Sequence, residues 1–234
     1  MMSGELLYEG KAKRVYGSDQ DDAVVMEFKD DATAFNGEKR GQIAQKGVIN
    51  RALTTRIYRY LEEHRIPTHV LAEIDDRRLL VRRLEMIGLE VVVRNRVAGS
   101  LCQRTGLEEG TGLQSPIVEF YFKNDRLGDP LLNDDHILAL NLADESTIHD
   151  LRALALRVNR VLTPFLFERD LILVDFKLEF GRFQGQLMLG DEISPDTCRL
   201  WDRVSLNKLD KDRFRRDLGD VEEAYQEVWR RVQR

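Results

Sequence analysis

The chain has 234 residues, of which 42% are hydrophobic and 33% charged, and 36 Lys and Arg against 41 Asp and Glu give a net charge of −5. A chain of this length and composition can form a normal core and is neither disordered nor collagen-like. Mild acidity argues against a broad nucleic-acid surface, which needs a basic face, but leaves room for a local basic pocket. With no apolar run of about 18 residues and no signal-peptide core, we expect a cytoplasmic protein without a membrane partner.

Residues 1–85 are predicted to form a small α+β lobe of short strands and one long helix. Strands are predicted at residues 6–9, 13–16, 23–28, 68–74 and 79–84. The polar stretch 29–41 is predicted to be a loop. Apolar residues recur at helical intervals over residues 42–64, and this pattern predicts a helix that Pro67 stops.

Residues 86–234 are predicted to form a larger α+β lobe. Strands are predicted at residues 89–97, 117–122, 171–180 and 183–190, the last two as a hairpin across Gly181. Ser146 is the candidate N-cap of a long helix that Pro164 should kink or end. Asp220 and Glu223 have the spacing of a capping box at the start of a C-terminal helix.

The segment LILVDFKLEF, residues 171–180, carries three charged residues in a mostly apolar strand. A period of two places Asp175, Lys177 and Glu179 on one face. A buried row of this kind needs compensation, which a divalent ion and an anionic substrate would supply. The alternative is a self-paired ionic row on a solvated strand. Asp191 follows the next strand and joins the same site only if the register turns it that way.

Two further segments are candidate phosphate sites. A glycine turn followed by Lys11 and Lys13 could lay amides and ammonium groups against polyphosphate, although it is not a Walker A loop. The alternative is a basic hairpin on the solvated surface. Residues 90–100 deliver Arg94 and Arg96, then Ser100 at a turn, which suits a monophosphate. Here the alternative is a strand end held by structural salt bridges.

Together these segments resemble the SAICAR synthetase family, phosphoribosylaminoimidazole-succinocarboxamide synthases of purine synthesis. The resemblance covers nearly the whole chain. Its most specific stretches are EVVVRNRVAGS at residues 90–100 and LVDFKLEFG at residues 173–181. Supporting stretches are GKAK at 10–13, KND at 123–125, DP at 129–130, LGDE at 189–192 and SPD at 194–196. Gly88 stands where the family usually has proline, and Val97 where it usually has a small residue.

The resemblance implies a two-lobed α+β fold, with a small N-terminal ATP-binding lobe similar to that of protein kinases. The active site would lie in the cleft between the lobes. It also implies a carbon–nitrogen ligase that uses ATP and Mg²⁺. Such an enzyme joins L-aspartate to the carboxylate of 5-amino-1-(5-phosphoribosyl)imidazole-4-carboxylate (CAIR), and the products are SAICAR, ADP and phosphate.

The family's functional residues are carried over only where this sequence matches the motifs. The residues that the resemblance assigns to ATP are Lys11, Ala12, Lys13, Arg82 and Met86, with Glu179 and Asp191 also holding Mg²⁺. It assigns the phosphate of CAIR to Arg94, Ser100 and Arg199. The region where carboxylate, aspartate and γ-phosphate meet is assigned to Lys123, Asp129, Asp175 and Lys177.

Two other classes of function compete with the ligase. One is a small-molecule kinase, which would leave a stable phosphorylated product. The other is a nucleotide-sensing module, which would bind ATP without turnover. The family is commonly oligomeric, so a homodimer is expected.

Overall fold

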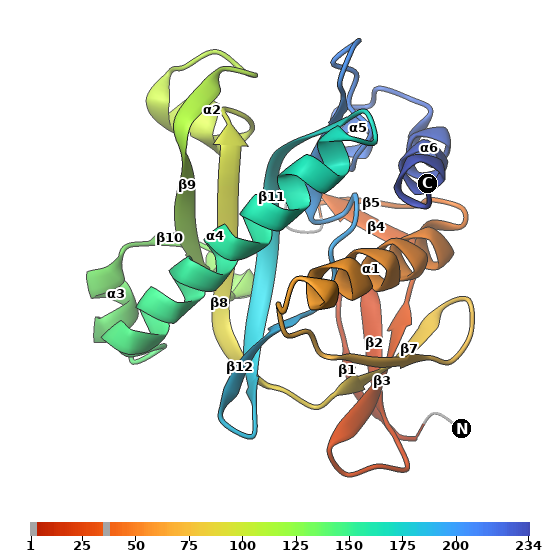
Figure 1. Cartoon of the computed structure of the whole chain (residues 1–234), viewed down its shortest axis with the longest axis vertical. Helices are drawn as coiled ribbons and strands as arrows, with labels where there is room; N and C mark the ends of the chain where they lie inside the picture. Colours follow the sequence, from red (N-terminus) through yellow and green to blue (C-terminus); the bar gives the residue numbers. More distant parts are fainter. Residues whose placement is uncertain (1–3, 35–37) are drawn as a thin grey trace.

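The computed structural model describes residues 4–34 and 38–234, which form a mixed α+β fold of curled antiparallel sheets (Figure 1). A five-stranded sheet has the order β1-β2-β3-β7-β6, and a six-stranded sheet has the order β10-β9-β8-β11-β12 with β13 also paired to β11. The sheets meet where the backbone of His69 and of Pro67 bonds to Leu189, with N···O distances of 3.0 Å each. No described helix is long and apolar enough to span a membrane.

The strands of the first sheet follow the predicted pattern closely. Their bounds are β1 Leu6–Glu9, β2 Lys13–Gly17, β3 Ala23–Phe28, β6 Val70–Glu73 and β7 Arg78–Arg82. The buried side chains of β3 and β7 form two small apolar clusters, one on each face of this sheet. The first sheet therefore has apolar clusters of its own, apart from the main core.

The predicted loop over residues 29–41 is wrong in its described part. Strands β4 (Asp31–Ala34) and β5 (Lys39–Gln42) pair there as a hairpin. Tertiary contacts hold it, since Lys39 Nζ donates to the carbonyl of Phe214 at 2.6 Å and the Phe214 ring packs against Gly41. These partners lie far away in the sequence, so local polarity misses the hairpin.

Helix α1 (Lys46–Glu63) is confirmed but starts later than predicted, because Gln45 has a left-handed φ of 64°. It ends at Glu63, and the chain then passes through Arg65, whose φ is 60°. The buried face of α1 packs against α4 and α6 and joins the main core. The N-terminal helix is thus part of the same core as the second sheet.

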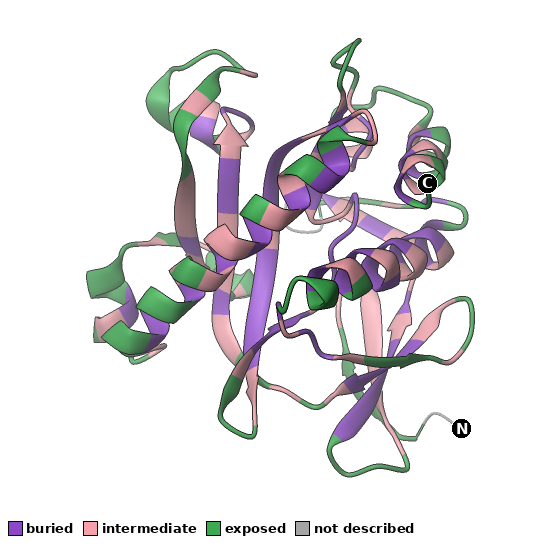
Figure 2. Cartoon of the chain, in the orientation of Figure 1, coloured by how far each residue is buried: buried purple, intermediate pink, exposed green. Residues whose placement is uncertain are grey.

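The second sheet carries a long helix across one face. Its strands are β8 Glu85–Arg96, β9 Gly112–Phe122, β10 Leu131–Leu132, β11 Leu171–Phe183, β12 Gln186–Gly190 and β13 Cys198–Asp202. Helix α4 (Glu145–Phe167) packs over β8, β9 and β11, and β11 is buried along most of its length (Figure 2). The charged residues of β11 consequently lie on the face that α4 does not cover.

The structure corrects the predicted N-cap of α4 and excludes one of the two alternatives given for Pro164. Its N-cap is Asp144, whose Oδ1 accepts from the backbone N–H of Thr147 at 2.7 Å, and Ser146 lies inside the helix. Pro164 does not end the helix, which continues to Phe167. The carbonyl that loses its hydrogen bond belongs to Arg160, an exposed residue, so water can replace the missing partner.

The hairpin β11–β12 turns later than predicted. Strand β11 runs through Gly181 to Phe183, and the turn lies at Gln184 and Gly185, both with positive φ. Gly181 serves a different purpose, because a Cβ there would lie 2.7 Å from the Cβ of Leu84. This glycine allows the start of β8 to approach β11 closely.

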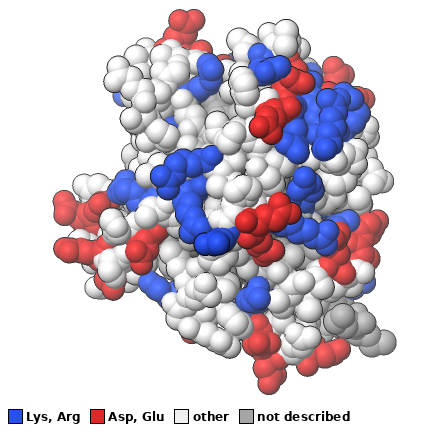
Figure 3. Space-filling model, viewed as in Figure 1, with Lys and Arg blue, Asp and Glu red and all other residues white. Residues whose placement is uncertain are grey.

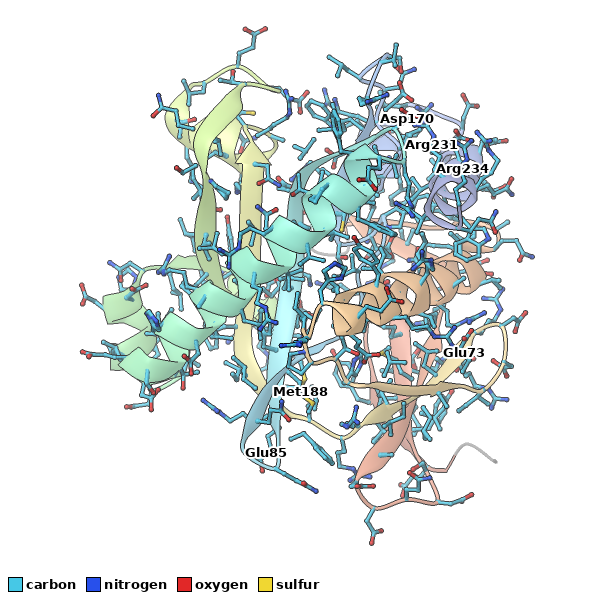
Figure 4. The ribbon with its side chains drawn as sticks, viewed as in Figure 1. Glu73, Glu85, Asp170, Met188, Arg231 and Arg234 are labelled. Atoms are coloured by element: carbon cyan, nitrogen blue, oxygen red, sulfur yellow. The ribbon has the colours of Figure 1, made fainter. Side chains whose placement is uncertain are left out.

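The remaining helices are α2 Ser100–Thr105, η2 Asp125–Leu127, α3 Asp134–Ala139, α5 Asp212–Arg215 and α6 Val221–Val232. The predicted capping box of α6 is wrong, since Asp220 has a φ of 47° and its side chain makes no cap hydrogen bond. Helix α6 is held instead by its buried apolar stripe and by Arg231, which lies beside Asp170 and donates to its carbonyl at 2.7 Å (Figure 4).

Candidate active site

A large charged cleft of about 1140 Å³ lies between elements of both sheets. It brings together every residue predicted for the site except Arg82 and Arg96: Lys11, Ala12, Lys13, Met86, Arg94, Ser100, Lys123, Asp129, Asp175, Lys177, Glu179, Asp191 and Arg199. The guanidinium of Arg82 instead donates to the carbonyl of Thr68 at 3.2 Å and lies over the ring of Phe183. The outer face over α1 and α4 shows basic and acidic side chains interspersed (Figure 3).

The row on β11 lies on one face, as the alternation predicts. Asp175, Lys177 and Glu179 line the cleft, while the residues between them belong to the main core. Lys177 Nζ lies 2.6 Å from Glu90 Oε1 and 3.1 Å from Glu179 Oε1. Burial lowers the pKa of Lys177, but these carboxylates outweigh it and raise the pKa above its usual range. The row is self-paired, but Asp175 and Glu179 are only 4% and 5% exposed, which excludes a solvated strand.

The end of β12 brings a further carboxylate to this row. Glu179 pairs with Gly190, so Asp191 emerges just beyond the strand and contacts Lys13 of β2. Lys13 Nζ also lies 2.8 Å from Glu192 Oε1. Burial alone would raise the pKa of Asp191, but Lys13, Lys177 and Lys123 lower it to about 2. Asp191 is therefore charged at neutral pH.

Lysines from two other segments complete this end of the cleft. Lys123, just after β9, contacts Glu179. Burial lowers the pKa of Lys123, but the negative charges of Glu179 and Asp191 outweigh it and raise the pKa. Lys11 is exposed and pairs with Asp125 at 2.7 Å. The backbone at Asp129 has a φ of 49°, and its Oδ1 accepts from the N–H of Asn124 at 2.9 Å. The arrangement presents several ammonium groups toward one region of the cleft.

A second cluster of cationic side chains surrounds Asp175. Arg94 Nη1 and Arg199 Nη1 both lie 2.8 Å from its Oδ2, and Arg94 Nη2 lies 3.2 Å from Ser100 Oγ. Burial lowers the pKa of both arginines, but Asp175 and further carboxylates raise it above the usual range. Structural salt bridges and a cluster of forked donors thus occur together here, and forked donors are the groups that suit a phosphate.

Arg96 does not join this cluster, although it was predicted beside Arg94. The pairing of β8 with β9 shifts register between the two arginines. Arg96 Nη1 donates to the carbonyl of Gly110 at 3.0 Å, and the residue is not among those lining the cleft. A strand irregularity has broken the alternation on which the prediction rested.

The residues fit a magnesium ion only with help from a ligand. In residues 4–34 and 38–234, no group of three or more His, Cys, Asp and Glu side chains is arranged to hold a metal. Glu179 and Asp191 provide two hard oxygen donors, which suit Mg²⁺ when phosphate oxygens and water complete the shell. Their present partners are the lysines described above.

Several cleft residues were missed from the sequence. They are Thr33, Glu90, Tyr121, Glu192, Asp196, Lys211 and Arg215. Asp196 is the clearest case, because Lys46 Nζ lies 2.6 Å from its Oδ2 and Tyr225 Oη donates to its Oδ1 at 2.6 Å. Lys46 opens α1 and Tyr225 sits in the apolar stripe of α6, so neither shows a local functional signal.

The fold and the cleft define an α+β protein built to bind small polyanionic molecules, with separate cation clusters for more than one anionic group. The SAICAR synthetase family model matches residues 6–232. A phosphoribosylaminoimidazole-succinocarboxamide synthase from Desulfitobacterium hafniense is 56% identical over 232 residues, covering 99% of this chain and 98% of that protein.

Solved structures agree with the sequence relatives. Phosphoribosylaminoimidazole-succinocarboxamide synthase from Ehrlichia chaffeensis superposes with a TM-score of 0.96 at 41% identity, covering 98% of each chain. A SAICAR synthetase in complex with ADP has a TM-score of 0.95 at 49% identity, covering 97% of each chain. The chain belongs to the SAICAR synthetase family, and it is an enzyme, a ligase of purine biosynthesis.

Proposed function

We propose that this enzyme joins L-aspartate to the carboxylate of CAIR at the expense of ATP, giving SAICAR, ADP and phosphate. The observation that carries the proposal is the shared cleft. A lysine-rich end around Lys13 and Lys123 and an arginine cluster around Arg94 are bridged by the buried row on β11. Two phosphate-bearing molecules would thereby meet above Lys177.

The lysine-rich end is proposed to bind ATP. Lys11 and Lys13 would hold the phosphates with the backbone at Ala12, and Met86 would border adenine. Glu179 and Asp191 would hold Mg²⁺, which would neutralise phosphate charge and align the γ-phosphoryl group. The complex of the related synthetase with ADP supports nucleotide binding. Arg82 remains a proposed ATP contact, although it donates to the Thr68 carbonyl and does not line the cleft.

We also propose that residues 1–85 and 86–234 act as two lobes, similar to those of protein kinases. The segment from Arg82 to Met86 connects β7 of the first sheet to β8 of the second, which supports a hinge there. A homodimer and a cytoplasmic location complete the proposal. Light scattering of the purified chain tests the dimer.

The reaction would proceed in two steps, a phosphoryl transfer followed by amide formation. A carboxylate oxygen of CAIR attacks the γ-phosphorus of ATP, so an O–P bond forms while the bond to ADP breaks. The amine of aspartate then attacks the acyl phosphate, a C–N bond forms, and phosphate leaves. Lys177 and Lys123 would offset the repulsion between two anions in the first step. Asp175 or Asp129 would accept the proton that the amine loses.

Isotope transfer tests this reaction. With ¹⁸O in the CAIR carboxylate, the label should appear in the released phosphate, and phosphate release should require both CAIR and aspartate. A stable phosphorylated product without an amide would identify a kinase and overturn the proposal. ATP binding without turnover in the full mixture would instead identify a nucleotide-sensing module.

A further inference from the structure

One end of the cleft carries two cations to which the proposed function assigns no ligand. Lys211 and Arg215 line the cleft close to Asp196 and Thr197, together with Thr33 of β4. Arg215 is the last residue of α5, and Lys211 directly precedes that helix. The backbone N–H of Lys211 donates to the carbonyl of Pro195 at 3.1 Å, which fixes its place at the cleft wall.

Lys211 lacks the anionic partner that comparable cleft cations have. A carboxylate lies within ion-pair distance of each of the other cleft cations that are not exposed, which are Lys13, Arg94, Lys177, Arg199 and Arg215. Across residues 4–34 and 38–234, the ammonium of Lys211 makes no ion pair and no hydrogen bond to a side chain. Asp196 and Glu192 are the carboxylates that act on Lys211. Asp196 is already engaged by Lys46 at 2.6 Å and by Tyr225, and Glu192 by Lys13 at 2.8 Å.

The electrostatics of this end of the cleft favour binding of an anion. Burial lowers the pKa of Lys211, Asp196 and Glu192 only partly oppose this effect, and the positive charges of Arg215 and Lys46 lower the pKa further. Arg215 uses Nη1 to bond Asp212 Oδ1 at 2.5 Å, which leaves its other N–H groups available. An ammonium and a partly free guanidinium on one wall form a strong site for a carboxylate or phosphate oxygen.

The identity of the anion follows from the cations that the other anionic groups already have, and this step rests on the proposed function. The nucleotide phosphates have the lysine-rich end, and the phosphate of CAIR has Arg94, Ser100 and Arg199. L-aspartate, with two carboxylates, has no cation of its own. We infer that Lys211 and Arg215 bind a carboxylate of L-aspartate and select a dicarboxylic amino acid over neutral ones.

The test compares Lys211→Met and Arg215→Met with Lys208→Met and Arg216→Met. The two control residues come from the same segment, but their side chains pair with Glu109 at 3.1 Å and do not line the cleft. The KM for L-aspartate should rise about tenfold or more in the first pair, because a charge-assisted bond is lost. The KM values for ATP and CAIR should stay within about threefold of wild type. The preference for L-aspartate over L-alanine should fall, and Lys211→Arg should restore part of it.

The outcomes separate the two proposals. Wild-type enzyme without aspartate-dependent phosphate release overturns the proposed function, and this inference with it. Active wild-type enzyme with an unchanged aspartate KM in both variants overturns this inference alone. An equal rise in all three KM values also overturns it, since that result indicates general damage to the site. ADP binding by calorimetry confirms that each variant is folded, and Lys211→Gln replaces Lys211→Met if the latter fails this check.

Discussion

Gly99 packs against Arg199 so closely that a Cβ on this glycine would lie 2.8 Å from the guanidinium carbon. The backbone of Gly99, with φ of 56° and ψ of −130°, is also one that residues with a side chain avoid. Gly99 thereby keeps the space that lets Arg199 reach Asp175. The glycine turn and the phosphate cluster are parts of one arrangement.

Gly99→Ala should therefore displace Arg199. We expect the KM for CAIR to rise about tenfold or more through the lost phosphate contact. Because alanine is strained in this backbone conformation, the free energy of unfolding should fall by about 1–3 kcal/mol. Gly106→Ala is the control, because Gly106 also has a positive φ of 70° but open space around its Cα. A similar change in KM in both variants would show that strain alone, and not the collision with Arg199, is responsible.

Arg94→Ala tests the same cluster from the other side. Arg94 is buried and bonds to Glu119, Asp175 and Ser100, so its loss removes forked donors from the phosphate site. Steady-state kinetics should show a far larger rise in KM for CAIR than for ATP. Arg96→Ala, two residues further along the strand but outside the cleft, should leave both KM values near wild type. Equal effects of Arg94→Ala on both substrates would mark Arg94 as purely structural.

Glu179→Gln tests the proposed metal role. The amide keeps the shape but removes the charge that Lys123 and Lys177 contact and that Mg²⁺ would need. ATP binding measured by calorimetry should lose most of its dependence on Mg²⁺, and turnover should fall about 100-fold or more. Glu168→Gln, on an exposed side chain after α4, should change neither quantity. Full activity of Glu179→Gln at low Mg²⁺ would refute the assignment.

The predictable part of the site is the part that regular strands position. Alternation along β11 correctly places Asp175, Lys177 and Glu179 on one face, because the strand is regular there and its other face is apolar. The same reasoning fails for Arg96, since the register shift in β8 leaves no trace in local sequence. Asp191 stayed undecided for a related reason, because its direction depends on the pairing of β12 with β11.

Residues brought in by tertiary packing could not be predicted from local patterns. Lys211 follows a loop whose position depends on two hydrogen bonds, in which the Leu200 N–H donates to Asp210 Oδ2 and the Lys211 N–H donates to the Pro195 carbonyl. The continuation of α4 past Pro164 is similar, because only the exposure of Arg160 makes the lost hydrogen bond tolerable. For Lys211 the deciding partners lie outside its own segment, and for Pro164 the deciding factor is the exposure of Arg160, which the helical pattern alone does not reveal.

His69 is buried within the electrostatic influence of Asp191 and Lys13, and neither ring nitrogen has a hydrogen-bond partner in the described structure. Its ring meets that of Tyr58 edge-on, with centroids 5.7 Å apart. Burial is the main cause that lowers its pKa to about 4, and Lys13 and Arg82 lower it further against the opposing charge of Asp191. The imidazole is therefore neutral in the folded enzyme at neutral pH.

This neutral histidine should make the fold sensitive to mild acid. The unfolded chain protonates His69 below about pH 6.5, whereas the folded chain resists until about pH 4, so the unfolded state binds more protons between these values. Stability is retained above pH 6.5 and falls as the pH drops toward 4. Between pH 7 and pH 4.5 this one residue should remove about 2–3 kcal/mol from the free energy of unfolding.

His69→Leu removes the titrating group and two unpaired nitrogens while keeping a similar volume. At pH 7 its stability in urea should lie close to that of wild type, because no hydrogen bond is lost. At pH 4.5 the variant should be more stable than wild type by most of the 2–3 kcal/mol given above. His149→Leu, on an exposed position of α4, should leave the pH dependence unchanged. Parallel pH profiles for wild type and His69→Leu would show that the imidazole has a partner or a charge that burial alone does not reveal.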